Sequence, residues 1–416
     1  MSAAHIEITE LGAQGDGVAA IGGDPVYVPF TGPGDKISAA VEGERGTLLS
    51  VLEPGPHRVA PPCPHFGPNG ENARCGGCAV QHIGHAFYTD WKRDLVAAAL
   101  ASRAIETDVS PLVRAQPGDR RRVVFAAIRD GQGVRLGFHR AGSHDIIAID
   151  ECLIAAPRII ASLPLFRRLA AHAAVKSKGF HMAVLDTTSG FDVAFDAPFA
   201  LAENDRLRLV AATRKIPEIA RISHNGETLF ESRAPQLEFG PVTVSPPPGA
   251  FVQASAAAEN AMAEIVLKHM SKAKRVIDLY AGCGTFATRL SKSHIVHAVE
   301  SHAPSLAALD RGMRRVQGLK PVTIETRDLV RRPLMTAELK NYQGLVFDPP
   351  RAGAEVQVRQ IAKSTVKFIA AVSCNPATLA RDVRLLMDGG YKLKSVTPID
   401  QFLYTPHVEA VALLIR

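Results

Sequence analysis

The sequence has no long hydrophobic run. Its apolar stretches, such as Val96–Ala101 and Ala410–Ile415, fall far short of the ~20 residues that a helix needs to cross a bilayer. Residues 1–10 have neither the basic start nor the apolar core of an export signal. Internal repeats and low-complexity tracts are absent as well. We therefore expect a chain that does not enter membranes and that works in the cytoplasm.

The sequence also lacks a large excess of charge of one sign. Of the 416 residues, 21% are charged and 46% are hydrophobic, which excludes a mainly disordered protein. Lys and Arg (48) outnumber Asp and Glu (41), so the net charge is +7. Residues 1–57 hold eight acidic and two basic residues, a net −6, which leaves +13 for the remainder. This distribution favours a polyanionic partner such as RNA for the later segments, whose basic clusters are Arg120–Arg122, Arg311 with Arg314 and Arg315, and Arg331–Arg332.

The length predicts two or three domains at ~150 residues each. In residues 1–57, short apolar runs alternate with glycine-rich turns, which is typical of a small β-barrel. Residues 58–245 contain strand-like and helical patterns, including an amphipathic helix at 90–105 that could pack on the C-terminal domain. Residues 246–416 alternate strands with helices and predict an α/β domain with a doubly wound parallel sheet. Such sheets bind ligands beyond the carboxyl ends of their strands, here expected at 275–279, 295–299, 322–326, 344–347 and 368–372.

Four of the six cysteines precede the C-terminal domain, namely Cys63, Cys75, Cys78 and Cys152. The two glycines between Cys75 and Cys78 let both thiolates converge on one ion. In a reducing compartment, clustered thiols indicate a metal rather than disulfides. Four thiolates suit either tetrahedral zinc or an iron–sulfur cluster, and both alternatives stay open at this point.

A glycine-containing loop, Asp278-Leu-Tyr-Ala-Gly-Cys-Gly284, follows the first strand of the C-terminal domain. Glycine lets the backbone approach a ligand closely, but this loop lacks the third glycine of a dinucleotide fingerprint. Glu300, about twenty residues further on, could accept hydrogen bonds from both ribose hydroxyls of an adenosine. Asp328 could receive the adenine amino group. Because there is no pyrophosphate to hold, S-adenosylmethionine fits better than NAD.

Two further segments follow strands of the same sheet. Asp348-Pro-Pro-Arg351 lacks the aromatic residue with which amino-group methyltransferases stack a target base, since Arg351 stands there instead. Cys374 lies after the strand at 368–372 and before an expected helix. We expect the N-terminus of that helix to stabilise the thiolate and make it a better nucleophile.

A nucleophilic thiolate is what methylation of a pyrimidine at carbon 5 requires. Addition of sulfur to carbon 6 makes carbon 5 electron-rich enough to attack a methyl donor. A base must then remove the carbon-5 proton before the sulfur leaves. Glu409, near the end of the chain, is the candidate base, and His407 is its rival.

Taken together, these motifs resemble RNA uracil-C5 methyltransferases, specifically the bacterial branch with an N-terminal TRAM domain and an iron–sulfur cluster. The resemblance covers nearly the whole chain. It rests on the small barrel and on Cys63-Pro-His-Phe66, Cys75-Gly-Gly-Cys78, Gln81-His82, Ser143-His144, Phe251-Val-Gln253, Asp278–Gly284, Asp348-Pro-Pro-Arg351, Ser373–Asp382 and His407-Val-Glu409.

The resemblance implies three domains. These are an OB-like TRAM barrel at 1–57, an α+β central domain at 58–245, and a class I, Rossmann-like S-adenosylmethionine-dependent methyltransferase domain at 246–416. It also implies that Cys374 is the nucleophile and Glu409 the base, and that Cys63, Cys75, Cys78 and Cys152 hold a 4Fe-4S cluster. The donor and uracil pocket would be lined by Gln253, Tyr280, Thr285, Glu300, Asp328 and Asp348. Thr285 stands where the best-known members have asparagine.

The implied activity is formation of 5-methyluridine in structured RNA by a monomeric enzyme. We expect 23S ribosomal RNA as the substrate, because transfer-RNA members of the family typically lack both barrel and cluster. The alternatives are a tRNA uridine-5 methyltransferase, a small-molecule or nitrogen-directed methyltransferase with structural zinc, and a non-catalytic RNA-binding assembly factor. The presence of Cys374 speaks against the second alternative, and the joint presence of nucleophile, base and donor loop speaks against the third.

Overall fold

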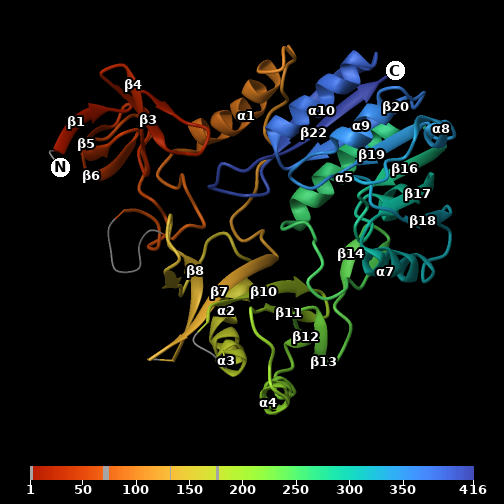
Figure 1. Ribbon diagram of the computed structural model, residues 1–416, viewed down its shortest axis with the longest axis horizontal. Coiled ribbons are helices and arrows are strands. Elements are labelled where there is room, and N and C mark those ends of the chain that lie inside the picture. Colours follow the sequence, from red (N-terminus) through yellow and green to blue (C-terminus); the bar gives the residue numbers. More distant parts are fainter. Residues whose placement is uncertain (1–2, 69–74, 132, 175–177) are drawn as a thin grey trace.

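The computed structural model describes residues 3–68, 75–131, 133–174 and 178–416. Within these residues, three large β-sheets of six, seven and seven strands follow one another along the chain. Figure 1 shows the N-terminal sheet in red at the upper left, the central sheet in yellow below, and the C-terminal sheet in green to blue at the upper right. No helix in the described ranges is long and apolar enough to pass through a bilayer.

The N-terminal sheet has the strand order β1-β5-β6-β4-β3-β2. The sheet encloses one hydrophobic core, which includes the fully buried side chains of Val28, Ile37 and Ala39. Alternation places Ile37 and Ala39 on the same face of β5. The strands are β1 (Ala3–Glu7), β2 (Glu10–Leu11), β3 (Gly17–Ile21), β4 (Asp24–Val28), β5 (Lys36–Glu42) and β6 (Arg45–Glu53).

The central sheet has the order β13-β12-β11-β10-β7-β8-β9. Alternate residues, among them Phe125, Met182 and Val193, form a core with the helices on one face of the sheet. These helices are α2 (Pro157–Ala161), α3 (Leu163–Ala173) and α4 (Glu203–Thr213). The strands are β7 (Arg122–Asp130), β8 (Gly133–His139), β9 (Ile146–Ala148), β10 (Phe180–Thr187), β11 (Gly190–Asp196), β12 (Ile219–His224) and β13 (Glu227–Glu231).

The C-terminal sheet has the order β18-β17-β16-β19-β20-β22-β21. Its first five strands are mutually parallel, and β22 runs antiparallel to both of its neighbours. The predicted doubly wound α/β domain is therefore confirmed. The strands are β16 (Arg275–Leu279), β17 (Ile295–Glu300), β18 (Val322–Thr326), β19 (Gly344–Phe347), β20 (Phe368–Ser373), β21 (Lys392–Ile399) and β22 (Glu409–Ile415).

The strands of this sheet are apolar at successive positions, so both faces of the sheet are hydrophobic. Helices cover both faces and bury them. Val276 and Val346 face the core under α5, α6 and α7, whereas Ile277 and Leu345 face the core under α8, α9 and α10. These helices are α5 (Ala256–Met270), α6 (Ala287–Leu290), α7 (Ala303–Met313), α8 (Thr336–Leu339), α9 (Glu355–Ile361) and α10 (Pro376–Asp388).

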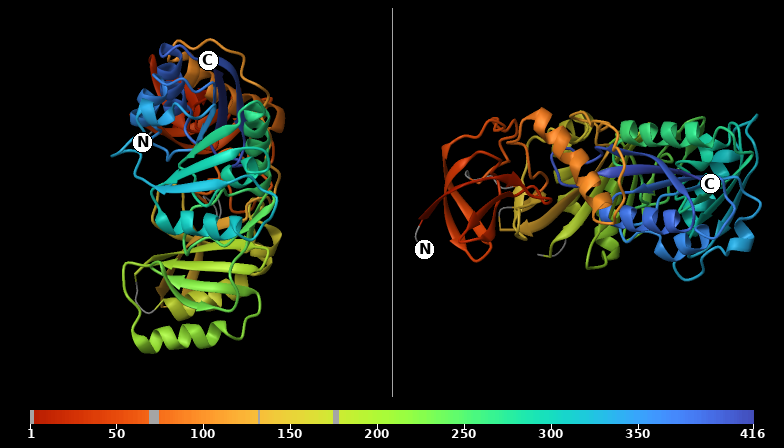
Figure 2. Two further views of the ribbon diagram at one scale, coloured as in Figure 1. Left: turned by 90° about the vertical axis from the view of Figure 1, so that its right-hand side faces the viewer. Right: turned by 90° about the horizontal axis from the view of Figure 1, so that it is seen from above.

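Helix α1 (His85–Ala101) lies against the C-terminal unit although it precedes the central sheet in sequence. It packs on α10, and Val96 and Leu100 enter the same core as α10 (Figure 2, right). The helix begins five residues before the predicted start at 90 and ends four residues before 105. Beyond it, Val109 and Val113 form parallel bridges to Val396 and Ile399, so the chain extends the sheet at its β21 edge.

A short hairpin leads from the central sheet to the C-terminal one. Its strands, β14 (Leu237–Phe239) and β15 (Val242–Val244), pack on α7, where Gly312 leaves room for Val242. The left view of Figure 2 shows the central unit directly below the C-terminal unit. After the hairpin, residues 248–253 line the cavity at the carboxyl edge of the parallel sheet, where ligands are expected.

Candidate active site

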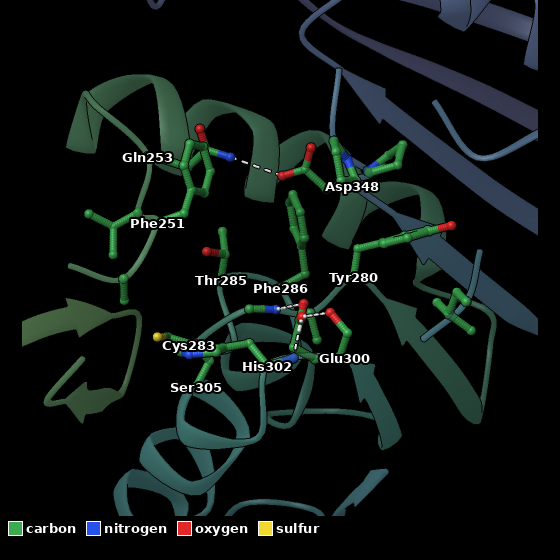
Figure 3. Close-up of a pocket in the computed structure, with 18 of the residues that line it drawn as sticks. Phe251, Gln253, Tyr280, Cys283, Thr285, Phe286, Glu300, His302, Ser305 and Asp348 are labelled. Atoms are coloured by element: carbon green, nitrogen blue, oxygen red, sulfur yellow. Dashed lines mark hydrogen bonds between the residues drawn. The ribbon is translucent and has the colours of Figure 1, made fainter. Parts of the chain in front are cut away.

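The loops at the carboxyl edge of the C-terminal sheet enclose a cavity of about 730 Å³. Every residue that the sequence assigned to the reaction or to the donor pocket lines this cavity. They come from seven separate segments and are Gln253, Tyr280, Thr285, Glu300, Asp328, Asp348, Cys374 and Glu409. Figure 3 shows most of the donor side, with Glu300 and Thr285 below and the pair Gln253–Asp348 above.

The loop after β16 is shaped by its glycines. Gly282 and Gly284 both have positive φ, and a β-carbon on Gly284 would clash with Leu309 of α7. A β-carbon on Gly282 would meet no atom within 4 Å, so the space beside it is open. Tyr280 also has a positive φ of 59°, a conformation that costs on the order of 1–3 kcal/mol for a side chain of this kind and is concentrated at functional sites.

Glu300 is held rigidly at the end of β17. Its Oε2 accepts the Gly282 N–H at 3.1 Å, and its Oε1 accepts the His302 N–H at 2.8 Å (Figure 3). Asp328 is held in a turn, because its Oδ1 accepts the N–H groups of Val330 and Arg331. A fixed carboxylate beside an open glycine fits an adenosine, whose ribose hydroxyls are donors.

On the other side of the cavity, four polar side chains form one hydrogen-bonded chain. Gln253 Nε2 donates to Asp348 Oδ2 at 2.9 Å, and its Oε1 accepts from Gln401 Nε2 at 2.8 Å. Gln401 Nε2 also donates to Glu409 Oε1 at 3.1 Å. Two amides therefore link the two carboxyl groups, which come from the ends of β19 and β22.

Burial dominates the electrostatics of this group. It raises the pKa of Asp348 to about 7, and together with the charge of Asp348 it raises the pKa of Glu409 to about 8. Glu409 Oε2 is buried and has no hydrogen-bond partner among the described residues. A carboxyl group with a pKa near neutrality can both take up and release a proton under ordinary conditions.

The expected stabilisation of the Cys374 thiolate at the start of a helix does not lower the pKa of the thiol overall. Burial and the charges of Glu409 and Asp348 raise the pKa of the Cys374 thiol to about 11. Cys374 stands before the N-cap of α10, Asn375, whose own side chain accepts the Ala377 N–H. Burial first, and then the two carboxylates, which are distant in sequence, outweigh the lowering effects of a backbone hydrogen bond and of Arg351.

The two candidates for the base occupy different places. Glu409 lines the same cavity as Cys374 and Asp348, whereas His407 lines a second cavity of about 560 Å³. The second cavity lies between the turn after β2, helix α1 and the start of α10. Cys374 and Arg351 line both cavities and so stand at their junction.

The four early cysteines line a third cavity of about 530 Å³, together with Gln81 and Arg120. Burial raises the pKa of the Cys78 thiol to about 12, and the charges of Cys152, Cys75 and Cys63 add to this effect. Within the described ranges, no three His, Cys, Asp or Glu side chains converge on a single metal ion. The four cysteines nevertheless line one cavity, and thiolates are the ligands that both zinc and iron–sulfur clusters take.

Sequence reasoning missed Gln401, which joins Gln253 to Glu409. An uncharged amide in a loop carries no signal of its own in a single sequence. The one available hint was its position between Asp400 and the segment that ends at Glu409.

Comparison with known proteins agrees with this geometry. Residues 244–416 match the family described as tRNA (Uracil-5-)-methyltransferase. An "uncharacterized RNA methyltransferase" of Agrobacterium fabrum is 49% identical over 414 residues, which is 100% of both chains. The chain belongs to the RNA uracil-5 methyltransferase family. The enzyme class predicted from the sequence, an S-adenosylmethionine-dependent RNA methyltransferase, is thereby confirmed.

Two further relatives of this uracil-5 methyltransferase carry more specific names. The 23S rRNA (uracil(1939)-C(5))-methyltransferase RlmD of Shewanella sediminis is 29% identical over 98% of this chain and 95% of its own. The Pyrococcus abyssi tRNA (uracil-54, C5)-methyltransferase, solved with S-adenosyl-L-homocysteine, has a TM-score of 0.76 at 22% identity and covers 99% of both chains. The whole fold, including the N-terminal sheet, is therefore similar to that of a solved methyltransferase.

Proposed function

We propose that the protein forms 5-methyluridine in structured RNA by covalent catalysis through Cys374. The observation that carries this proposal is the meeting of Cys374, Glu409 and Asp348 in one cavity with the glycine loop and Glu300. A non-catalytic assembly factor would have no need to assemble a thiol, two carboxyl groups and a donor loop from separate strands. S-adenosylmethionine supplies the methyl group when it is bound.

In this proposal, each residue has one task. The Cys374 sulfur forms a bond to carbon 6 of uracil, and the electron pair of the 5,6 double bond makes carbon 5 nucleophilic. After carbon 5 has been methylated, Glu409 takes its proton. The S–C6 bond then breaks, which restores the double bond and releases the thiolate. Glu300, Asp328, Tyr280 and Thr285 hold the donor, and Gln253 with Asp348 holds the uracil ring.

The high pKa of the Cys374 thiol is compatible with this chemistry. The charges of Glu409 and Asp348 are among its causes, so protonation of either carboxyl group lowers the pKa of the thiol. Both carboxyl groups have raised pKa values and are therefore able to accept a proton near neutral pH. The thiol proton passes by way of a carboxylate to solvent before methyl transfer, so that Glu409 is again ionised when it takes the carbon-5 proton.

For the RNA, we propose 23S ribosomal RNA, since the relative named RlmD matches 98% of this chain. The argument from the N-terminal barrel is weaker than the sequence suggested, because the Pyrococcus abyssi enzyme, named for tRNA, matches 99% of the chain. Transfer RNA is therefore the second candidate, and it is also named in the description of the family.

The function is tested with RNA that contains 5-fluorouridine. Fluorine at carbon 5 cannot leave as a proton does, so the enzyme stays bonded to carbon 6. We expect a conjugate that survives denaturing electrophoresis with wild-type protein and none with Cys374→Ala. Transcripts of 23S rRNA and tRNA, compared side by side, identify the substrate. A wild-type protein that methylates RNA without ever forming a conjugate would rule out the covalent route.

We further propose that Cys63, Cys75, Cys78 and Cys152 hold a 4Fe-4S cluster. The support is that four thiols line one cavity, beside the guanidinium of Arg120, whose charge suits an anionic cluster. When bound, the cluster would crosslink three segments of the chain. Protein purified without oxygen should be brown and contain about four iron and four sulfide ions per chain, and Cys78→Ser should lose both. A colourless protein with one zinc ion would contradict the cluster.

We also propose that residues 1–57, 58–245 and 246–416 are the three domains, the first of TRAM type. The three large sheets fall within these ranges. Limited proteolysis should cut near residues 57 and 245 before it cuts within the sheets. Cleavage inside β5 or β10 at equal rate would contradict this division.

A further inference from the structure

Gln401 lies in the loop between β21 and β22 and is only 3% exposed. Its Oε1 accepts the backbone N–H of Ser255 at 3.4 Å. A backbone N–H can only donate, so this contact determines which end of the Gln401 amide is the carbonyl. The amide nitrogen therefore faces the opposite way, where its two hydrogens go to Gln253 Oε1 at 2.8 Å and Glu409 Oε1 at 3.1 Å.

This contact in turn fixes the orientation of Gln253. Because its Oε1 is occupied by Gln401, its Nε2 must face Asp348, to which it donates at 2.9 Å. Figure 3 shows this nitrogen pointing from Gln253 across the cavity toward the Asp348 carboxyl group. An amide nitrogen carries two hydrogens, and the second remains for a ligand. Gln253 thus presents a donor to the cavity, next to an acceptor on Asp348.

Uracil and cytosine differ in the groups that such a pair would contact. Uracil has a carbonyl oxygen at position 4 and an N–H at position 3, so it offers an acceptor beside a donor. Cytosine has an amino group at position 4 and an unprotonated nitrogen at position 3, so it offers the reverse. A donor on Gln253 and an acceptor on Asp348 are complementary to uracil. With cytosine, the donor on Gln253 would face the amino group, and the acceptor on Asp348 would face the unprotonated ring nitrogen.

We propose that Gln401 is a positioning residue that selects uracil over cytosine by fixing the orientation of the Gln253 amide. This inference rests on the proposed function, in that a pyrimidine ring must occupy the cavity. Gln401 itself touches no substrate and acts through Gln253. Opposed polar groups in a buried site discriminate strongly because neither finds another partner.

The test uses the mapped target transcript and a second transcript with cytidine in place of the target uridine. The measured quantity is the ratio of kcat/KM for uridine to that for cytidine, with 5-methylcytidine detected by mass spectrometry. In Gln401→Glu, a carboxylate replaces the amide nitrogen and can only accept, so Gln253 turns and offers its carbonyl to the cavity. We expect the ratio to fall by ~100-fold or more.

In Gln401→Met, both contacts are lost and only the Asp348 carboxyl group still orients the Gln253 amide, so the ratio should fall less, by ~10-fold. This variant also removes a donor from ionised Glu409. The pKa of Glu409 should rise further, and the rising limb of the pH profile should move to higher pH. A residue with a merely structural role would lower the rate without moving either quantity.

Gln357→Met is the matched control. Gln357 is also fully buried, and its amide binds both backbone groups of Leu334, at 2.8 and 3.1 Å, away from the cavity. Its substitution should reduce stability and leave the uridine-to-cytidine ratio unchanged.

The inference is overturned if both Gln401 variants keep the wild-type ratio within ~threefold. If Gln401→Glu fails to fold, Gln401→Met decides the question. Failure of the proposed function is a separate result, because it shows as a wild-type protein that forms no conjugate with 5-fluorouridine RNA. A conjugate in the wild type together with an unchanged ratio in both variants rejects the role of Gln401 alone.

Discussion

Lys92 of α1 and Asp400 of the β21–β22 loop form an ion pair of 2.7 Å in which neither side chain is exposed by more than 1%. Lys92 Nζ also donates to the carbonyl oxygens of Phe402 and His407. The hydroxyl of Tyr88, one turn earlier in α1, donates to the other Asp400 oxygen. Helix α1 thereby fixes the loop that carries Gln401 and leads into Glu409.

Substitution Lys92→Met should be strongly destabilising. It leaves the Asp400 carboxylate buried without its cation, which costs about 3–5 kcal/mol. The loop should also lose its anchor, and methylation should fall by at least ~10-fold. Urea unfolding and methyl-transfer rates check both effects.

Two companion variants make this prediction specific. Lys92→Met/Asp400→Asn removes both charges and should recover much of the lost stability. Lys36→Met breaks an exposed pair, Lys36–Glu53, and should change the unfolding curve little. Equal losses for the two lysines would show that burial of the Lys92 pair has no energetic importance.

Substitution Glu409→Gln should stop the reaction after methyl transfer. The glutamine cannot take the carbon-5 proton, so the S–C6 bond persists and normal RNA should remain attached to the protein. We expect turnover to fall by at least ~100-fold while a conjugate accumulates. If the variant turns over slowly without any conjugate, Glu409 is not the base, and His407→Ala becomes the next variant to measure.

The activity of the wild type should rise with pH. Glu409 must be ionised to accept a proton, and its pKa is raised to about 8 by burial and by Asp348. Turnover under saturating conditions should therefore increase from pH 6 to beyond pH 8, provided that a chemical step limits the rate. A flat profile in single-turnover experiments would contradict this prediction.

The same shift predicts how stability depends on pH. The folded-state pKa of Glu409 lies above its ordinary value of 4.5, so its contribution to stability is fully present below that value and is lost as pH rises through about 8. Glu409→Gln stays neutral and should gain about 4 kcal/mol relative to wild type between pH 5 and pH 9. Urea unfolding at both pH values measures this difference, and parallel curves would contradict it.

Substitution Glu300→Gln should weaken binding of S-adenosyl-L-homocysteine by ~10-fold or more. The amide has only one acceptor oxygen, whereas the carboxylate offers two to the N–H groups of Gly282 and His302 and to the ribose hydroxyls. Isothermal titration calorimetry gives the dissociation constant. Glu325→Gln, on the neighbouring strand β18 and outside the cavity, is the control and should bind as wild type does.

The parallel sheet was the easiest part of the fold to predict. Strands β16, β18 and β19 coincide with the predicted ranges, because strands covered by helices on both sides are short apolar runs with clear ends. The N-terminal barrel was predicted only as a whole, and the alanines of β3 give no alternating pattern that would locate that strand. The ends of α1 were misplaced because tertiary contact with α10, rather than local composition, determines its extent.

The candidate site divides in the same way. Glu300 is the last residue of a strand and Cys374 directly follows one, so their positions follow from the sequence. The pKa of Cys374 does not, because it depends on Glu409 and Asp348, which only the folded chain brings near. Gln401 belongs to the same class, since its importance lies entirely in its two neighbours.

Cys374 and Arg351 separate two cavities that extend from the thiol in different directions. If S-adenosyl-L-homocysteine occupies the cavity with Glu300 and the RNA strand extends through the cavity beside α1, either product can leave before the other. Product-inhibition patterns of a random rather than an ordered release would be the kinetic mark of this arrangement.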